Sequence, residues 1–391
     1  MIVLTAASLV TPLECIPDPL LLIEDQAIVE VTSRRSRELP RCRTLDFGDA
    51  VLAPGLFDMH IHGSAGHDVM GPGANGLAAI EIFLARHGVT AYLPTTVTAP
   101  LDVTLAALER LADAIEPTTN RQGSVPRARP LGIHIEGPFL SQKRRGVHPP
   151  NNLLPPTLET FDRLWQAARG HIRAMTISPE LQGALEVIAA AAHRGVCVSL
   201  GHSDANLEAA RAGIAAGARH ATHTFNAMRP FGHRDPGIIG EVLTNSQITA
   251  DIIADGMHVD PAAVKLFLGC KGVERSVLIT DATAGAGMPP GHYRMGAFEF
   301  DVNNGKCLAN GVLAGSLLSL DEAVQNVMQF AGWELRHAVR AASFNPAKAA
   351  RLTNRGVLQA GAAADVVVLS RAGEVRTTII GGKVVDRAVS M

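Results

Sequence analysis

The sequence predicts an α/β protein built on a (β/α)8 TIM-type barrel, with a small β-domain formed by the two ends of the chain. Three observations predict it. Strand-like and helix-like segments alternate through the middle of the chain and supply eight strands, the number of a closed barrel. Both ends consist instead of short β-runs and turns. Hydrophobic residues make up 47% of the chain and charged residues only 18%, which suits the buried strands of a parallel sheet.

The two ends and the middle are expected to form separate domains. The 391 residues suit a barrel of about 250 residues or more plus an accessory domain. We expect residues 1–53 and 354–391 to form the β-domain and residues 54–353 to form the barrel. The N-terminal segment shows no helical period, and its apolar runs lie at 2–10, 19–31 and 44–52. Residues 356–385 have the same character, so the two ends are expected to pair.

The first barrel strand lies in residues 52–63, LAPGLFDMHIHG, where an apolar run leaves a Pro-Gly turn and ends on His60 and His62. Side chains two residues apart on a strand point the same way. Both imidazoles would then reach the carboxyl end of the barrel, where barrel enzymes place their chemistry. A metal site is the first hypothesis, and a structural or chance His-x-His pair is the alternative.

The remaining barrel elements follow in alternation. Further strands are predicted at 89–95, 131–136, 171–177, 196–202, 219–225, 248–254 and 276–281. Helices are predicted at 76–86, 101–115, 158–168 and 181–194, with another that ends at 216. Such alternation implies right-handed βαβ units, and eight repeats favour closure. The glycine-rich segments 63–73 and 283–291 are interpreted as lid-like loops; neither contains G-x-G-x-x-G, so no dinucleotide site is expected.

Polar residues recur where these strands end. Besides the first-strand pair they are Glu136, His202, His223 and Asp281. Singly, each histidine could be a satisfied core residue and Glu136 a cap. Together they suit a divalent metal that activates water, because the barrel mouth brings strand ends to one point. Asp281 could also accept a proton from water and pass it to a leaving amine; a capping role is its alternative.

A set of motifs spread along the chain resembles the N-acetylglucosamine-6-phosphate deacetylase family of the amidohydrolase superfamily. In order, they are APGLFDMHIHG, GIHIEGPFLS, RGVHPP, SLGHSDA, THTFNAM, ADGMHVDP, LITDATAGAGMPPGHYRMG and LAGSLLSLDEA. The resemblance covers nearly the whole chain. It implies a (β/α)8 barrel, a composite β-sandwich made by both termini, a homodimer, and hydrolysis of the acetamide of an amino-sugar phosphate.

The resemblance also implies roles for single residues. Glu136, His202 and His223 match the family's main metal ligands. Asp281, beside the metal, matches the acid/base, and His148 matches the residue that helps to polarise the acetyl carbonyl. The other matches are to groups that contact the substrate: Asn226, Ala227, Arg234 and His258. The resemblance further suggests that Arg234 binds the phosphate in the site of the neighbouring subunit; because loop length varies around residues 231–235, His233 stays an alternative.

The expected cofactor is a divalent metal, one or two ions per chain. Some family members replace the first-strand histidines with Gln and Asn and use one metal. This chain keeps His60 and His62, so a second ion bridged by Glu136 is expected. Imidazole and carboxylate ligands suit Zn, Fe, Mn and Co alike, so the sequence leaves the metal open.

Three other functions stay open. The nearest has the same mechanism with N-acetylgalactosamine 6-phosphate. A cyclic-amide hydrolase would need a carboxylated lysine at the end of the fourth strand, and the stretch HIRAMTISPE has none. The third is a barrel protein without catalysis, against which the complete set of predicted ligands argues.

The overall composition of the chain limits which classes of partner and which cellular location are expected. A net charge of −2 predicts no nucleic-acid or membrane partner. The five cysteines are scattered and free of Cys-x-x-Cys, which favours reduced thiols and a cytoplasmic protein. The N-terminal residues lack the basic region of a leader, and no apolar run approaches the roughly 18 residues of a membrane helix.

Overall fold

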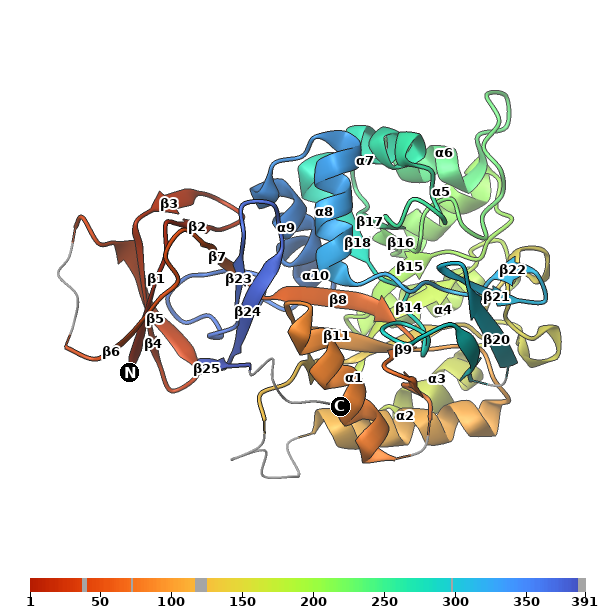
Figure 1. Cartoon of the computed structure of the whole chain (residues 1–391). Coiled ribbons are helices and arrows are strands. Elements are labelled where there is room, and N and C mark those ends of the chain that lie inside the picture. Colours follow the sequence, from red (N-terminus) through yellow and green to blue (C-terminus); the bar gives the residue numbers. More distant parts are fainter. Residues whose placement is uncertain (37–40, 72, 117–124, 297, 386–391) are drawn as a thin grey trace.

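The computed structural model describes residues 1–36, 41–71, 73–116, 125–296 and 298–385, and the predicted (β/α)8 barrel is confirmed (Figure 1). Its eight parallel strands are β8 (Leu56–Ile61), β11 (Val89–Thr96), β13 (Ile133–Glu136), β14 (Ile172–Ile177), β15 (Cys197–Leu200), β16 (His220–Ala221), β17 (Ala250–Ile253) and β18 (Ser276–Ile279). Strands β8, β11, β13, β14, β15 and β16 pair in this order, and β17 pairs with β18.

Backbone hydrogen bonds between these two groups close the sheet into a barrel. Ala221 N–H donates to the Thr249 carbonyl over 3.1 Å, which joins β16 to the start of β17. Asp281 N–H donates to the His60 carbonyl over 2.9 Å, which joins the end of β18 to β8. The carboxyl ends of all eight strands therefore surround one opening, as the sequence required for a shared site.

One predicted strand is much shorter than expected. The prediction of a strand over 219–225 is wrong beyond Ala221, because the chain turns out of the sheet there. The backbone of His223 and Phe225 has positive φ angles of 30° and 82°, which a regular strand does not have. The segment that leaves the sheet carries residues of the candidate site.

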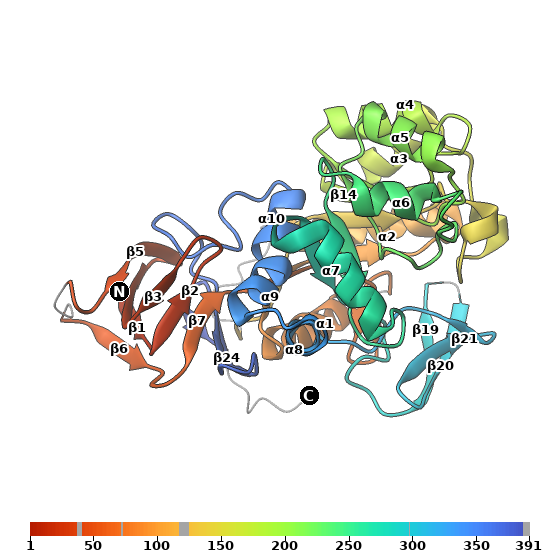
Figure 2. The same cartoon turned by 90° about the horizontal axis from the view of Figure 1, so that it is seen from above.

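Helices cover the outside of the barrel (Figure 2). They are α1 (Ala74–Arg86), α2 (Leu101–Ile115), α3 (Leu158–Ala167), α4 (Ala184–His193), α5 (Leu207–Ala216), α6 (Gly237–Thr244), α7 (Pro261–Arg275), α8 (Leu320–Ala331), α9 (Leu335–Ala342) and α10 (Phe344–Ala349), with short 3-10 turns at Gln142–Arg144 and Pro150–Asn152. Helix α2 has the predicted bounds, because its buried residues, among them Leu108 and Leu111, recur at the helical period. Helices α6 to α10 lie where no helix had been singled out.

The two ends of the chain form two facing sheets beside the barrel, at the left of Figure 1. One has the order β5-β4-β1-β6, with β1 at Ile2–Thr5, β4 at Pro19–Glu24, β5 at Ala27–Ser33 and β6 at Arg43–Asp46. The other has the order β25-β24-β23-β7-β2-β3, with β2 at Ser8–Val10, β3 at Cys15–Pro17, β7 at Val51–Pro54, β23 at Val366–Leu369, β24 at Val375–Ile380 and β25 at Lys383–Val384. Leu4, Leu52 and Val368 share the buried core of both.

The strands β7 and β23 bring the N- and C-terminal segments into one sheet. They are antiparallel, with Val51 opposite Leu369. The chain passes from this sheet into the barrel between Pro54, the end of β7, and Leu56, the start of β8. The domain division at 53/54 and 353/354 stays a prediction, and residues 37–40 and 386–391 of the expected β-domain lie outside the described residues.

Both segments interpreted as lid-like loops contain or lead into strands. Residues 63–73 contain the paired strands β9 (Gly63–Ser64) and β10 (His67–Asp68). Elsewhere in the chain, the short strand β12 (Arg129–Pro130) pairs with β11 of the barrel. Residues 283–291 lead into an unpredicted antiparallel sheet of β19 (Gly291–Met295), β20 (Phe298–Asn303), β21 (Lys306–Ala309) and β22 (Val312–Leu313). This inserted sheet lies on the side of the barrel away from the terminal sheets (Figures 1 and 2).

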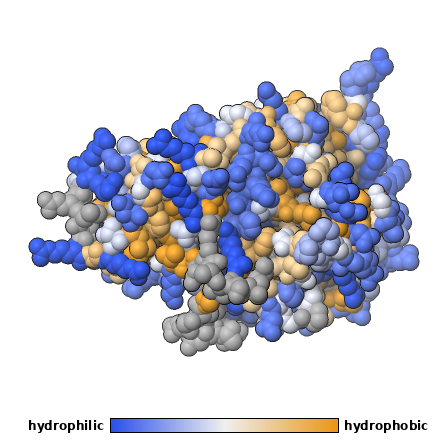
Figure 3. All heavy atoms as spheres, viewed as in Figure 1, coloured by the Kyte–Doolittle hydropathy of each residue, from blue (hydrophilic) through white to orange (hydrophobic). Residues whose placement is uncertain are grey.

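The face in Figure 3 is mainly hydrophilic, with groups of hydrophobic residues between the hydrophilic ones. This is the usual surface of a protein in water. Within the described residues, the helices are too short or too polar to span a bilayer.

Candidate active site

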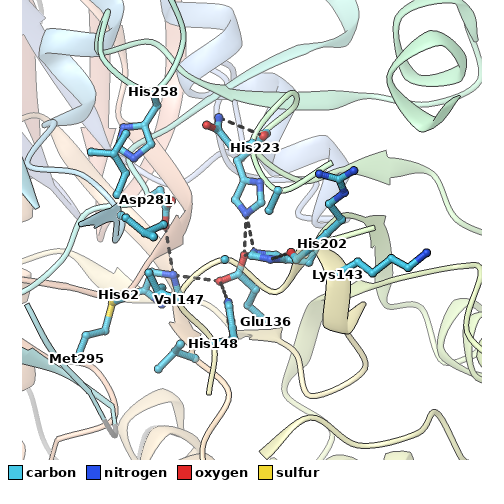
Figure 4. Close-up of a pocket in the computed structure, with 18 residues that line it drawn as sticks. His62, Glu136, Lys143, Val147, His148, His202, His223, His258, Asp281 and Met295 are labelled. Carbon is cyan, nitrogen blue, oxygen red and sulfur yellow. Dashed lines mark hydrogen bonds and ion pairs between the residues drawn. The ribbon is translucent and has the colours of Figure 1, made fainter. Parts of the chain in front are cut away.

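A cavity of about 330 Å³ opens at the carboxyl ends of the barrel strands. Its walls include six of the residues expected to carry chemistry: His62, Glu136, His148, His202, His223 and Asp281. Figure 4 shows these side chains turned toward one another. The residues meet because they end or follow five of the barrel strands, with Glu136 and His148 both belonging to β13 and the loop after it.

Glu136, the last residue of β13, lies at the centre of the cluster. Its Oε1 atom is 3.0 Å from His223 Nε2 and 3.3 Å from His202 Nε2. Its Oε2 atom is 3.2 Å from His62 Nε2 and 3.5 Å from His148 Nε2. One carboxylate therefore faces the imidazoles of four different segments.

The first-strand histidines meet Asp281 on the other side of the cluster. Asp281 Oδ1 lies 3.4 Å from His60 Nε2 and 3.2 Å from His62 Nε2. Two groups of buried donors result, His60 with His62 and Asp281, and Glu136 with His148 and His202, and within each group the donor atoms all lie within 4.8 Å of one another.

Hydrogen bonds behind the rings fix how two of the histidines face the centre. His62 Nδ1 lies 3.0 Å from the Thr95 carbonyl, and His202 Nδ1 lies 2.9 Å from the Arg144 carbonyl. A carbonyl only accepts, so each Nδ1 carries a hydrogen and each Nε2 is left facing the centre of the cluster. From this position Nε2 of a neutral ring can bind a metal ion.

The charges of the cluster also favour a cation. Burial alone would raise the pKa of Asp281, but the charge of His60 and the hydrogen bond from His62 bring it to about 2. Burial would likewise raise the pKa of Glu136, and the surrounding histidines hold it well below its usual range. Against the effect of burial, Glu136 raises the pKa of His223 to about 9. Two ionised carboxylates that draw positive charge into a buried site fit a divalent metal with N and O ligands.

Three of the clustered residues have backbone angles that L-residues rarely adopt. The φ angle is 48° at His202, 30° at His223 and 50° at Asp281. Such positive φ values cost energy at non-glycine residues and concentrate at functional sites. At Asp281 the conformation is held by the bond from its N–H to His60 and by the Ser316 N–H, which donates to the Asp281 carbonyl over 2.8 Å.

His148 faces the cavity as a neutral donor. The backbone N–H of Thr98 donates to His148 Nδ1 over 3.3 Å, so this atom accepts and the ring proton is on Nε2. Burial lowers the pKa of His148 to about 4, despite the nearby Glu136. The Nε2–H group can therefore donate a hydrogen bond to an oxygen in the cavity near neutral pH.

The expected substrate-binding residues divide into two groups. Asn226, Ala227 and His258 line the cavity, and His258 Nδ1 is held 2.6 Å from Asp255 Oδ2. Arg234 and His233 are exposed and lie outside the cavity lining of the described chain. A role for Arg234 in a neighbouring subunit stays a prediction.

Four further residues at the site were not predicted from the sequence. Lys143 and Arg144 line the cavity, and the basic run before His148 was the available signal. His134 lies two residues before Glu136 on β13, so both side chains share the inner face of the barrel. Its Nε2 atom is 2.8 Å from Thr176 Oγ1. Asp251 accepts the backbone N–H of His223 and so holds that residue's backbone.

Comparisons with known proteins bear on the family and the fold. The sequence profile of the amidohydrolase family matches residues 51–385. The N-acetylglucosamine-6-phosphate deacetylase of Lysinibacillus sphaericus is 38% identical over 335 residues, which cover 85% of each chain. The N-acetylgalactosamine-6-phosphate deacetylase of Escherichia coli O157:H7 is also 38% identical over 335 residues, which cover 85% of this chain and 87% of that protein. The structure of a Mycobacterium smegmatis N-acetyl-D-glucosamine-6-phosphate deacetylase mutant with N-acetyl-D-glucosamine-6-phosphate superposes with a TM-score of 0.90, at 34% identity over 98% of this chain and 99% of that chain.

Proposed function

Because this chain belongs to the amidohydrolase family, among the N-acetylglucosamine-6-phosphate deacetylases, we propose that it hydrolyses the acetamide of N-acetylglucosamine 6-phosphate to glucosamine 6-phosphate and acetate. The observation that carries the proposal is the meeting of Glu136, Asp281 and the inward-facing histidines at one cavity. A binding protein without catalysis would not require such a costly group of buried donors. The reaction would be a step in amino-sugar breakdown or in the recycling of cell-wall sugars.

The proposed metal ligands are those that the family resemblance implied. Glu136, His202 and His223 would hold one divalent ion, since both Nε2 atoms lie within 3.3 Å of Glu136 Oε1. His60 and His62, with Glu136 shared, would hold a second, with Asp281 beside them. A bound ion lowers the pKa of water and polarises a carbonyl oxygen. We propose zinc as the first metal to test, while the N and O ligands also suit Fe, Mn and Co.

The chain's own residues would move the protons. Asp281 would accept a proton from the water that attacks the acetyl carbon, and would pass it to the sugar nitrogen as the C–N bond breaks. His148 Nε2–H would donate to the acetyl oxygen as negative charge develops there. Since the pKa of Asp281 is held at about 2, its carboxylate is ionised near neutral pH, which is the form that can accept a proton.

Binding of the sugar phosphate would use residues farther from the metal. Asn226, Ala227 and His258 would meet the sugar and its phosphate. Arg234 would bind the phosphate in the site of a second copy, because a guanidinium offers paired bonds to phosphate oxygens. We therefore propose a homodimer. A cytoplasmic location is supported by the free thiols of all five cysteines.

The galacto epimer is the second candidate substrate. It is favoured by the Escherichia coli relative, which is as similar as the Lysinibacillus one. A cyclic-amide hydrolase has less support, because Ile177 and Ser178, not lysine, stand at the end of β14.

Steady-state kinetics test the proposal. The metal-loaded protein is compared on N-acetylglucosamine 6-phosphate, N-acetylgalactosamine 6-phosphate and unphosphorylated N-acetylglucosamine, with acetate and free amine measured together. We expect the gluco phosphate to give the highest kcat/KM. A higher value for the galacto epimer would change the substrate, and no acetate from any of the three would refute the function.

A further inference from the structure

The cavity has an apolar wall beside His148. We give this name to three of the apolar residues that line the cavity, Val97, Val147 and Met295. Val97 precedes Thr98, whose backbone N–H and hydroxyl both bond His148 Nδ1, and Val147 directly precedes His148 in the chain. The wall therefore adjoins the group that would contact the acyl oxygen.

Met295 completes this wall from the inserted sheet. It is the last residue of β19, and only 2% of its surface is exposed. Figure 4 shows its side chain extending toward His62. A flexible thioether at this place brings an apolar surface to the first-strand metal group.

At Val97 the wall is backed by packed atoms. The next residue, Gly296, lies so close to Val97 that a Cβ atom built on it would be 2.5 Å from Val97 Cγ1. Behind Val97, its backbone N–H donates to the Met70 sulfur over 3.3 Å, and Met70 is itself buried. Extra substrate volume at this wall would force close-packed side chains to move.

Only one part of the proposed substrate matches this wall. The sugar ring carries hydroxyls and the far end carries the phosphate, whereas the acyl group ends in a methyl on the reacting carbon. An apolar group is favoured against a buried apolar surface. We propose that Val97, Val147 and Met295 form the acyl subsite and set the length of the acyl chain that the enzyme removes. This inference rests on the proposed function.

The test compares N-acetyl-, N-propionyl- and N-butyryl-glucosamine 6-phosphate as substrates. In the unchanged enzyme each added methylene should lower kcat/KM by about tenfold or more. Met295→Ala and Val97→Ala, which open the wall, should reduce the acetyl-to-propionyl ratio by about tenfold. Val147→Leu, at a half-buried position, should raise it. Melting curves establish that each variant is folded.

Val312→Ala is the matched control. Val312 is an apolar residue of the same cavity, but it lies on β22 and is 50% exposed. Any change in KM that Val312→Ala causes should be equal for all three substrates. Unchanged ratios in the folded wall variants would overturn the acyl subsite and leave the proposed function intact. If the unchanged enzyme released no acid from any of the three, the proposed function would fail first, and the subsite with it.

Discussion

At Asp281 the position and the charge of one carboxylate decide whether the reaction can proceed. Asp281→Asn keeps the size of the side chain but cannot take a proton from water. We expect kcat to fall by about 10² to 10⁴-fold, the usual loss for a general acid/base, with KM changed little. Three quantities are measured for the variant: its turnover, its metal content and its melting temperature. Near-normal turnover in a folded, metal-loaded variant would mean that another residue is the base, and His148 would be the next candidate.

His148 offers a test of the proposed hydrogen bond to the acetyl oxygen. His148→Ala should lower kcat by about 10² to 10³-fold, and His148→Gln, which keeps an N–H donor, should lose less. Because burial lowers the pKa of His148 to about 4, the neutral donor form prevails above that pH. The kinetic profile should therefore show no His148 titration between pH 6 and 8. An equal loss of kcat in both variants would mean that the ring of His148 matters for packing and not as a hydrogen-bond donor.

His60 and His62 decide the number of metal ions. Changing the pair to Gln and Asn removes both imidazoles of one donor group and leaves Glu136, His202 and His223 in place. We expect the metal content, measured by elemental analysis, to fall from up to two ions per chain toward one. The His60→Gln, His62→Asn variant should also melt at a lower temperature, since a bound ion stabilises only the folded chain. Unchanged metal content would assign the pair a structural role.

The residues of the site differ in how far the sequence revealed them. Glu136 and Asp281 could be predicted because the first ends β13 and the second follows β18 by two residues, in a regular alternation of strands and helices. The tautomer of His148 could not, since it depends on Thr98, 50 residues away in the chain. Asp251 was equally hidden, because its partner is the backbone N–H of His223 rather than a side chain with a recognisable spacing.

At the level of elements, prediction succeeded where local pattern and tertiary packing agree. Helix α2 repeats its apolar residues at helical spacing and packs that stripe on the barrel. The predicted strand over 219–225 failed because residues from His223 onward adopt the conformation of the site, against the preference of their sequence. The sheet β19 to β22 was missed because its strands are short, carry polar and charged residues among the apolar ones, and pair only with one another.

The contact between the segment after β22 and the segment after β18 can be tested with one glycine. Gly315 has a φ of 63°, and a Cβ atom would lie 2.6 Å from Thr283 Cγ2 and 2.7 Å from the Asp281 carbonyl oxygen. Gly315→Ala should therefore displace Asp281 and lower kcat by about tenfold to a hundredfold. It should also lower stability by about 1–3 kcal/mol, measured by denaturant unfolding.

Gly311→Ala controls for backbone strain alone. Gly311 has a similar φ of 79°, but nothing lies within 4 Å of its Cβ position. This variant should lose stability and keep its kcat. If both variants lost turnover equally, the close approach to Asp281 would not be the cause.

On the scale of the whole molecule, the terminal sheets bring the start and the end of the chain together beside the first barrel strand. That both ends would be β-structure was predictable, since neither shows a helical period. Which strands pair was not, because the register of β7 with β23 joins residues more than three hundred positions apart, and no local signal fixes such a pairing.

Arg234 carries the remaining prediction, which concerns two copies of the chain. Its guanidinium is exposed and away from the cavity of its own chain, as expected if it serves a second copy. Arg234→Ala should then raise KM for the phosphorylated sugar strongly and barely affect the slow reaction of the unphosphorylated one. Arg336→Ala, at another exposed arginine, should change neither value.

Mixing Arg234→Ala with Asp281→Asn protein distinguishes sharing between subunits from action within one. If Arg234 reaches the neighbouring site, a mixed dimer holds one site with an intact Asp281 from the first chain and an intact Arg234 from the second. After free exchange, about a quarter of full activity should return in a two-fold symmetric dimer. If Arg234 serves its own chain, every site in the mixture lacks one of the two groups. Proven subunit exchange without recovered activity would therefore end the claim of a shared phosphate site.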